Sequence, residues 1–131
     1  MSRFEGKVAI VTGGAVGIGR ATARRLAAEG ARVSIGDRDG EGAGKTASEL
    51  GESALGLTCD VGIQGDVENL VDQTVKRFGR IDVLVNNAGT FLLGREVSEI
   101  DPEQWDHLIR VNLTGPFYAC RAAIPHMKAQ G

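Results

Sequence analysis

Apolar residues recur along the chain with two different periods, in alternating blocks. Short runs rich in Val, Ile and Leu are apolar on both faces, which is typical of strands in a parallel sheet. They predict strands over Lys7–Thr12, Arg32–Asp37, Ala54–Cys59 and Ile81–Asn86. The segments between them have the helical period, and they predict helices over Val16–Glu29, Asp39–Leu50 and a third stretch from Val67 to Phe78.

The first and third helices carry the clearest signals for a buried face and for an end. In the first helix we expect Ile18, Ala21 and Leu26 to share the apolar face, and Gly30 to end the helix. The third helix has the densest helical spacing and ends at Gly79. Its apolar face consists of Val67, Leu70, Val71, Thr74, Val75 and Phe78.

A further helix begins near Asp101. This residue is a good N-cap, Pro102 suits the first helical position, and Gln104 completes a capping box. We expect Pro116 and Pro125 to break or kink the helix. Its apolar stripe consists of Trp105, Leu108, Ile109, Leu113, Phe117, Cys120, Ile124 and Met127.

Strands that alternate with helices predict βαβ units and an α/β fold with a doubly wound parallel sheet. The 131 residues suffice for a single domain, 1–131, with a core of its own. The alternation stops after four strands, where a fifth would be expected. We therefore expect a truncated sheet and a domain that is incomplete at its C-terminus.

Composition narrows the function classes. A net charge of -2, with 42% hydrophobic and 24% charged residues, offers no basic patch for nucleic acid. Two distant cysteines, Cys59 and Cys120, predict free thiols in a reducing compartment. No apolar run is long enough to span a membrane, and the N-terminus lacks the apolar stretch of a signal peptide. We expect a cytoplasmic protein that binds neither membranes nor nucleic acid.

The stretch from Val8 to Gly19 is the most informative, because an apolar strand leads through glycines directly into a helix. In its G-x-x-x-G-x-G spacing, Gly13 permits a tight turn, Gly17 lets the backbone approach a ligand, and Gly19 lets the helix pack on the strand. Backbone N–H groups and the helix dipole then meet at one point. This arrangement predicts a pyrophosphate site and thus a dinucleotide ligand.

Acids and amides follow the other predicted strands. Asp37 ends the second strand near the spacing expected of an acid that holds the adenosine ribose, and its charge opposes the extra phosphate of NADP. It therefore favours NAD, with NADP less favoured, although the neighbouring Arg38 is a residue type that accepts a 2′-phosphate. Asp60 and the segment Asn86–Gly89 follow the third and fourth strands, at the same edge of the sheet.

These motifs together resemble the short-chain dehydrogenase/reductase family. T-G-G-A-V-G-I-G at 12–19, D-V at 60–61, N-N-A-G at 86–89 and V-N at 111–112 carry the resemblance, which runs from Lys7 to the last residue. It implies a Rossmann-type fold, a nicotinamide cofactor and a catalytic role for Asn112. The cofactor-binding residues that it implies are Thr12, Gly13, Gly17, Ile18, Gly19, Asp37, Asp60, Val61, Asn87, Ala88 and Gly89.

The family's catalytic serine and Tyr-x-x-x-Lys are not among these residues. The single tyrosine, Tyr118, is followed four positions later by Ala122, and we interpret it as a packing residue. No serine follows Ser98, and His107 and His126 lack the spacing of metal ligands. Without a tyrosine and lysine pair, no proton reaches or leaves the carbonyl oxygen, so this chain alone is expected to be inactive.

Three interpretations stay open. The chain is the cofactor-binding part of an NAD(P)-dependent oxidoreductase acting on a small-molecule alcohol or carbonyl compound. Alternatively, it is a non-catalytic dinucleotide-binding module, or a truncated fragment without function. For a full-length form, the resemblance implies a homodimer or homotetramer.

Overall fold

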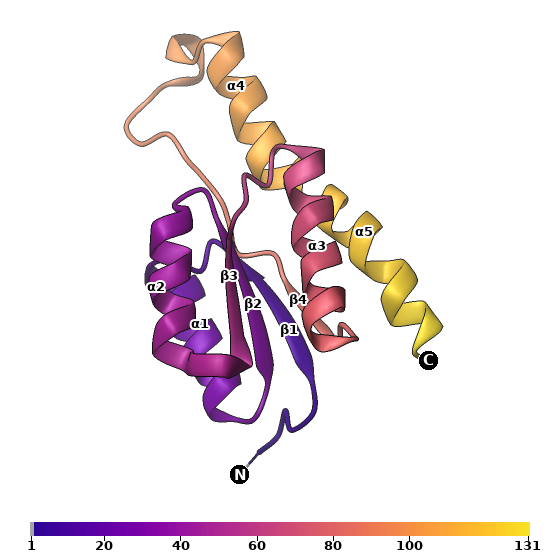
Figure 1. The fold of residues 1–131 in the computed structure, drawn as a ribbon. Helices are drawn as coiled ribbons and strands as arrows, with labels where there is room; N and C mark the ends of the chain where they lie inside the picture. The colour runs from indigo at the N-terminus through magenta and orange to yellow at the C-terminus, as the bar shows by residue number, and fades with distance from the viewer. Residues whose placement is uncertain (1) are drawn as a thin grey trace.

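The computed structural model describes residues 2–131. Four parallel strands form one sheet in the order β3-β2-β1-β4, which confirms the predicted doubly wound α/β fold (Figure 1). The strands are β1 Val8–Thr12, β2 Arg32–Asp37, β3 Ala54–Thr58 and β4 Val83–Val85. The α-helices are α1 Gly17–Ala28, α2 Gly40–Leu50, α3 Gln64–Phe78, α4 Pro102–Ile109 and α5 Gly115–Ala129. Short 3₁₀ turns span Gly51–Ser53 and Val97–Glu99, and a π-helical segment, Arg110–Thr114, joins α4 to α5.

Helices cover both faces of the sheet, with α1 and α2 on one side and α3 and α5 on the other (Figure 1). Because successive strand residues point to opposite faces, β1 contributes to both layers. Ala9 and Val11 pack with Ala23 and Leu26 of α1, whereas Ile10 joins the layer under α3 and α5. The apolar residues of β1 are fully buried, as its unbroken apolar run predicted.

Local signals define the helix ends. Asp39 caps α2 by accepting the N–H of Gly42 at 2.9 Å, a cap that was not predicted. Asp101 and Gln104 form the predicted capping box of α4. Gly79 ends α3 in the left-handed conformation, with φ of 80°.

The first helix differs from its prediction, because Ile18 is 80% exposed and Ala21 is also exposed. The buried face of α1 consists instead of Gly19, Ala23 and Leu26. Ile18, in the first turn of α1, therefore lies outside the packed layer between this helix and the sheet.

Two further details of the prediction change in the last third of the chain. Pro125 lies inside α5 without ending it, whereas the helical pattern does change beside Pro116, which follows the π-helical segment in the first turn of α5. β4 is also shorter than the predicted Ile81–Asn86, because the main-chain N–H and C=O groups of Ile81 bond to the side chain of Gln130 rather than to a strand.

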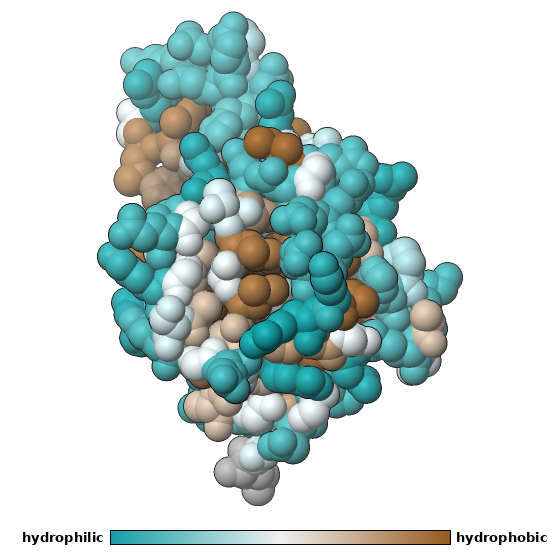
Figure 2. Space-filling view, in the orientation of Figure 1, coloured by the Kyte–Doolittle hydropathy of each residue, from teal (hydrophilic) through white to brown (hydrophobic). Residues whose placement is uncertain are grey.

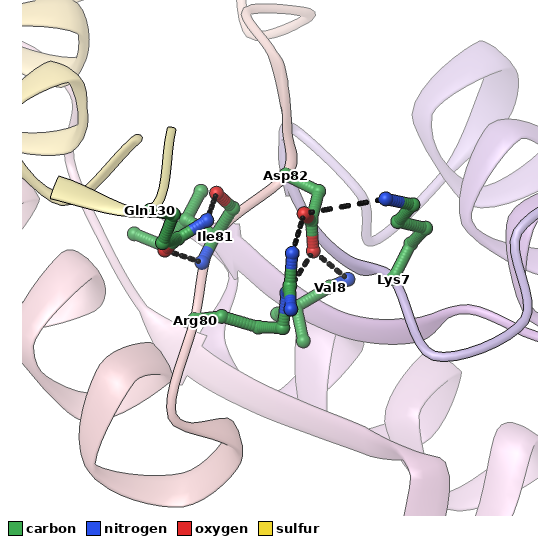
Figure 3. Close-up of polar contacts among 6 residues, drawn as sticks. All are labelled: Lys7, Val8, Arg80, Ile81, Asp82 and Gln130. Carbon is green, nitrogen blue, oxygen red and sulfur yellow. Dashed lines mark hydrogen bonds and ion pairs between the residues drawn. The ribbon is translucent and has the colours of Figure 1, made fainter. Parts of the chain in front are cut away.

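Side chains hold the amino end of the sheet (Figure 3). The carboxylate of Asp82 accepts the N–H of Val8 at 2.9 Å and two bonds from Arg80, while Lys7 lies 3.8 Å away. Arg80 in particular holds the pKa of Asp82 below its ordinary value. Beside it, Gln130 accepts the N–H of Ile81 at 3.0 Å and donates to its carbonyl at 2.8 Å. These bonds fix β4 next to β1.

The segment between β4 and α4 extends beyond the carboxyl ends of the strands. Its apolar side chains Phe91, Leu93 and Val97 are 72%, 81% and 87% exposed. Figure 2 shows the corresponding hydrophobic surface below α4, at the level of this segment. Within residues 2–131, no helix combines the length and apolar character that crossing a membrane requires.

Candidate functional site

The turn after β1 consists of glycines that touch the segment following β4. Gly13 has φ of 68°, and its N–H donates to the carbonyl of Gly36 at 2.7 Å. A Cβ on Gly13 would lie 2.8 Å from Asn87 Nδ2 and 2.9 Å from Ala88 Cα, and a Cβ on Gly19 would overlap the Gly13 carbonyl. Side chains at either position would therefore separate the turn from its neighbours.

Gly17 faces open space instead. Its φ is 59°, and an added Cβ would meet no atom within 4 Å. It begins α1, whose N-cap residue Val16 makes no side-chain capping bond. Within the described residues, the first N–H groups of this helix thus lack a side-chain acceptor, and the positive end of the helix dipole lies beside them. This is the local geometry that binds an anion such as a phosphate.

Thr12 and Asn87 join β1 to the segment after β4. Thr12 Oγ1 accepts the N–H groups of Asn87 and Ala88, each at 3.1 Å. In return, Asn87 Nδ2 donates to the carbonyls of Thr12 at 2.9 Å and Gly13 at 3.1 Å. The carboxyl end of β1 and the segment after β4 are thereby held at a fixed separation.

Asp37 lies at the carboxyl end of β2 with its carboxylate held by the backbone. Its Oδ2 accepts the N–H of Ala15 at 3.0 Å, and its Oδ1 accepts the N–H of Asp39 at 2.9 Å. Each carboxylate oxygen has room for a second donor. The arrangement presents a rigid acceptor pair to a diol, which is the predicted role for the adenosine ribose.

Asp60 lies next to Asp37 at the carboxyl end of β3. Its Oδ1 accepts the N–H of Gly62 at 2.9 Å, and its Oδ2 lies 3.8 Å from Arg38 Nε. The thiol of Cys59, beneath these groups, has its pKa raised to about 12, mainly by burial and then by Asp66, Asp60 and Asp37. This end of the site is therefore acidic, with Arg38 beside it.

These features surround one cleft of about 500 Å³ at the carboxyl ends of the strands. The size is ordinary for a cofactor site. Eight of the predicted residues line it: Gly13, Gly17, Ile18, Asp37, Val61, Asn87, Ala88 and Gly89. Thr12 and Gly19 lie behind this lining, and Asp60 and Asn112 bond to residues beside or within it.

A second groove, of about 570 Å³, lies between α3 and α5 and includes Tyr118 and Arg121. It runs between two helices, away from the strand ends where ligands bind in open parallel sheets. The strand-end cleft is the functional candidate, since the glycines, the acids and the helix N-terminus converge there.

Comparison with protein families matches residues 7–131 to the family described as short chain dehydrogenase. The chain belongs to the short-chain dehydrogenase family. The match covers the glycine turn, both strand-end acids and the helix that carries Asn112.

Individual relatives are similar over nearly all of this chain but extend well beyond it. An indene-carboxyl-CoA reductase of Mycobacterium tuberculosis is 46% identical, over 95% of this chain and 49% of the relative. A sorbitol dehydrogenase of Cereibacter sphaeroides is 41% identical, over 98% and 50%. A 3-ketoacyl-(acyl-carrier-protein) reductase from Brucella melitensis, solved with NADH, superposes with a TM-score of 0.94 at 40% identity, over 96% and 52%. The chain spans about half the length of these short-chain dehydrogenase relatives.

Asn112 lies in the π-helical segment and is tied to the segment after β4. Its Oδ1 accepts the N–H of Thr90 at 2.8 Å, and its Nδ2 donates to the Thr90 carbonyl at 2.7 Å. A π turn shifts the local hydrogen-bond pattern, and such turns are frequent at functional sites. Asn112 therefore anchors the wall of the cleft that follows Gly89. Its catalytic role stays a prediction.

Tyr118 packs as the sequence predicted. It is half-buried against the core layer beneath α3 and α5, and its ring lies 5.9 Å from that of Phe117. It belongs to the lining of the groove between the helices and not to that of the cleft.

Sequence reasoning missed part of the cleft wall. The additional lining residues are Val16, Cys59, Thr90, Phe91 and Val111. Val16 and Thr90 adjoin predicted motifs, so proximity along the chain was an available signal. Val111 had the same signal, since it precedes Asn112 in the V-N motif, whereas Phe91 had none and is placed in the cleft by the segment after β4.

Proposed function

We propose that this chain is the cofactor-binding part of an NAD-dependent oxidoreductase that acts on an alcohol or ketone. The observation that carries the proposal is the single cleft that contains both the glycine turn, with its open helix N-terminus, and the rigid carboxylate of Asp37. A pyrophosphate and a ribose need these two features side by side. Supporting this, the superposed Brucella reductase was solved with NADH.

The residues at the cleft fit a dinucleotide in shape as well as in chemistry. Gly17 leaves the space that a side chain would fill, next to free N–H groups for the pyrophosphate. Asp37 would accept hydrogen bonds from the ribose, Asp60 and Val61 would contact the adenine, and the remaining predicted residues would line or brace the cleft. Thr12, Gly19 and Asn87 would hold its shape.

We propose NAD rather than NADP, because the fixed carboxylate of Asp37 would face a 2′-phosphate. At about 4 Å, such a repulsion is worth about 1 kcal/mol in water and about 4 kcal/mol at an effective dielectric constant of 20. Either repulsion energy suffices for a measurable preference for NAD over NADP.

When bound, nicotinamide supplies the hydride acceptor or donor for an alcohol or ketone carbon. In this chain Asn112 would support the site through its main chain, while its side chain holds Thr90. The chain contains no Tyr-x-x-x-Lys, so we expect these 131 residues alone to bind cofactor without turning over substrate. Oxidation of sorbitol with NAD by the purified chain would refute this expectation.

The wider assignments rest on family resemblance and cysteine usage. We propose a small-molecule alcohol or carbonyl substrate, and a homodimer or homotetramer for the full-length form. The free thiols Cys59 and Cys120 support a reducing, cytoplasmic setting. We propose that residues 1–131 belong to one dinucleotide-binding domain.

Titration of the purified chain with NADH, followed by nicotinamide fluorescence, tests the proposal. Saturable binding is expected, and Asp37→Ala should weaken it about tenfold or more while relaxing discrimination against NADPH. Asp106→Ala makes the same charge change at an exposed residue of α4 and should leave both unchanged.

Two results would contradict the proposal. Absence of saturable binding by a chain that circular dichroism shows to be folded would remove the dinucleotide function. An unchanged NADH/NADPH preference in the Asp37 variant would refute the role given to that carboxylate.

A further inference from the structure

Arg38 is the one cationic side chain in the lining of the cleft, within the part of the chain that the structure describes. It follows Asp37 directly, so its backbone is fixed by the bonds that hold that residue. Its guanidinium Nε lies 3.8 Å from Asp60 Oδ2. The Arg38 side chain is 66% exposed and that of Asp60 is 30% exposed, which leaves the arginine the more mobile partner.

Asp60 is a fixed partner. Its Oδ1 accepts the N–H of Gly62 at 2.9 Å, and its own N–H donates to Asp66 Oδ2 at 2.9 Å. Both the carboxylate and the main-chain N–H of Asp60 therefore form hydrogen bonds around the start of α3. Because the carboxylate of Asp60 is fixed and the Arg38 side chain is long and flexible, the carboxylate determines where the guanidinium lies.

The acids around Cys59 are Asp37, Asp60 and Asp66, which all raise the pKa of its thiol after the larger effect of its burial. Of these three, Asp60 is the acid that forms an ion pair with Arg38.

We propose that Asp60 helps to select NAD over NADP by holding Arg38 away from the ribose 2′ position. This inference rests on the proposed dinucleotide function. A guanidinium is well suited to bind a phosphate through two parallel hydrogen bonds. The ion pair draws the Arg38 guanidinium towards Asp60, so a move of the guanidinium to a 2′-phosphate loses this pairing, in addition to the direct repulsion by Asp37. Asp60 acts through Arg38 as a specificity-determining residue.

The test measures dissociation constants of NADH and NADPH by fluorescence for the chain and five variants. Asp60→Asn keeps an acceptor for Gly62 but removes the charge, and should raise NADPH affinity relative to NADH by about two- to fivefold. If the asparagine variant does not fold, Asp60→Ser, which also lacks the charge, should likewise raise NADPH affinity relative to NADH. Arg38→Ala should produce no gain, and Arg38→Ala combined with Asp60→Asn should abolish the gain.

Asp106→Asn is the matched control, because it removes the same charge from an exposed acid of α4 that does not pair with Arg38. It should change the NADPH/NADH ratio less than about twofold, as expected for a screened, unpaired charge.

The outcomes separate this inference from the proposed function. If the wild-type chain binds NADH but Asp60→Asn leaves the ratio unchanged, the inference is wrong and the dinucleotide function stands. If the double variant keeps the full gain in NADPH affinity, the loss of repulsion between Asp60 and the 2′-phosphate explains that gain, and the role given to Arg38 is wrong. If the folded wild-type chain binds neither dinucleotide, both proposals fall.

Discussion

Replacing Thr12 with valine removes the hydroxyl group of this side chain while keeping nearly the same volume. Thr12 is 1% exposed, and its Oγ1 accepts two backbone N–H groups, from Asn87 and Ala88, at 3.1 Å each. Valine has nearly the same shape but accepts no hydrogen bond. Both N–H groups would therefore lose their protein partner at the junction of β1 with the segment after β4.

The expected loss of stability follows from these two groups. A buried donor left without an acceptor costs about 1–3 kcal/mol, so two such donors cost about 2–6 kcal/mol. Because Asn87 and Ala88 are half-buried, water replaces part of the lost bonding, and the lower half of that range applies. The extra buried methyl group returns about 1 kcal/mol. We expect Thr12→Val to lower the free energy of unfolding by about 2 kcal/mol.

Urea unfolding of the wild type, Thr12→Val and Thr12→Ser measures this effect. Serine keeps the acceptor and loses one methyl group, at a cost of about 1 kcal/mol. Amide hydrogen exchange at residues 87 and 88 should accelerate in the valine variant only. The reasoning fails if Thr12→Val is as stable as Thr12→Ser, or if exchange at these two amides is unchanged.

Three other changes probe distant parts of the fold. Gly19→Ala should destabilise the fold by about 1–3 kcal/mol, because the added methyl group overpacks its surroundings. Gly44→Ala, inside α2 with open space around it, should stabilise the fold by about 0.5–1 kcal/mol. Equal urea midpoints for the two variants would contradict this expectation. Gln130→Ala should cost about 1–2 kcal/mol and expose the amide of Ile81 to exchange, since both bonds between them are lost. Glu29, whose pKa two arginines lower to about 2 from 4.5, should stabilise the fold above pH 4.5 and lose this effect as pH falls towards 2. The difference in melting temperature between wild type and Glu29→Gln should therefore shrink over that interval, and a constant difference would refute the assignment.

The periodic part of this structure could be predicted from the sequence. Arg32–Asp37 forms a strand with the predicted bounds, and Gly79 and Asp101 act as the expected helix signals. These features depend on residues close together in the chain, where the 3.6-residue period, glycine conformation and capping chemistry leave a local pattern. The glycine spacing likewise predicted the tight turn at Gly13.

The remainder depends on contacts that leave no local pattern. Ile18 has the hydropathy of a core residue, but it is exposed and belongs to the lining of the cleft. The bonds between Thr12 and Asn87 and the pair formed by Arg38 and Asp60 join residues of different strands, so only the assembled sheet reveals them. The π turn around Asn112 depends in the same way on the segment that it touches.

The amide of Gln130 has a consequence for how the sheet can grow. The N–H of Asp82 donates to the carbonyl of Val8 in β1, so the main-chain groups of the preceding residue, Ile81, point towards the opposite, open side of β4. Gln130 occupies both of those groups, much as a peptide unit of a neighbouring strand would. A strand that adds to this side therefore finds its first free groups at Val83. A single side chain thus limits how far an added strand can pair towards the amino end of β4.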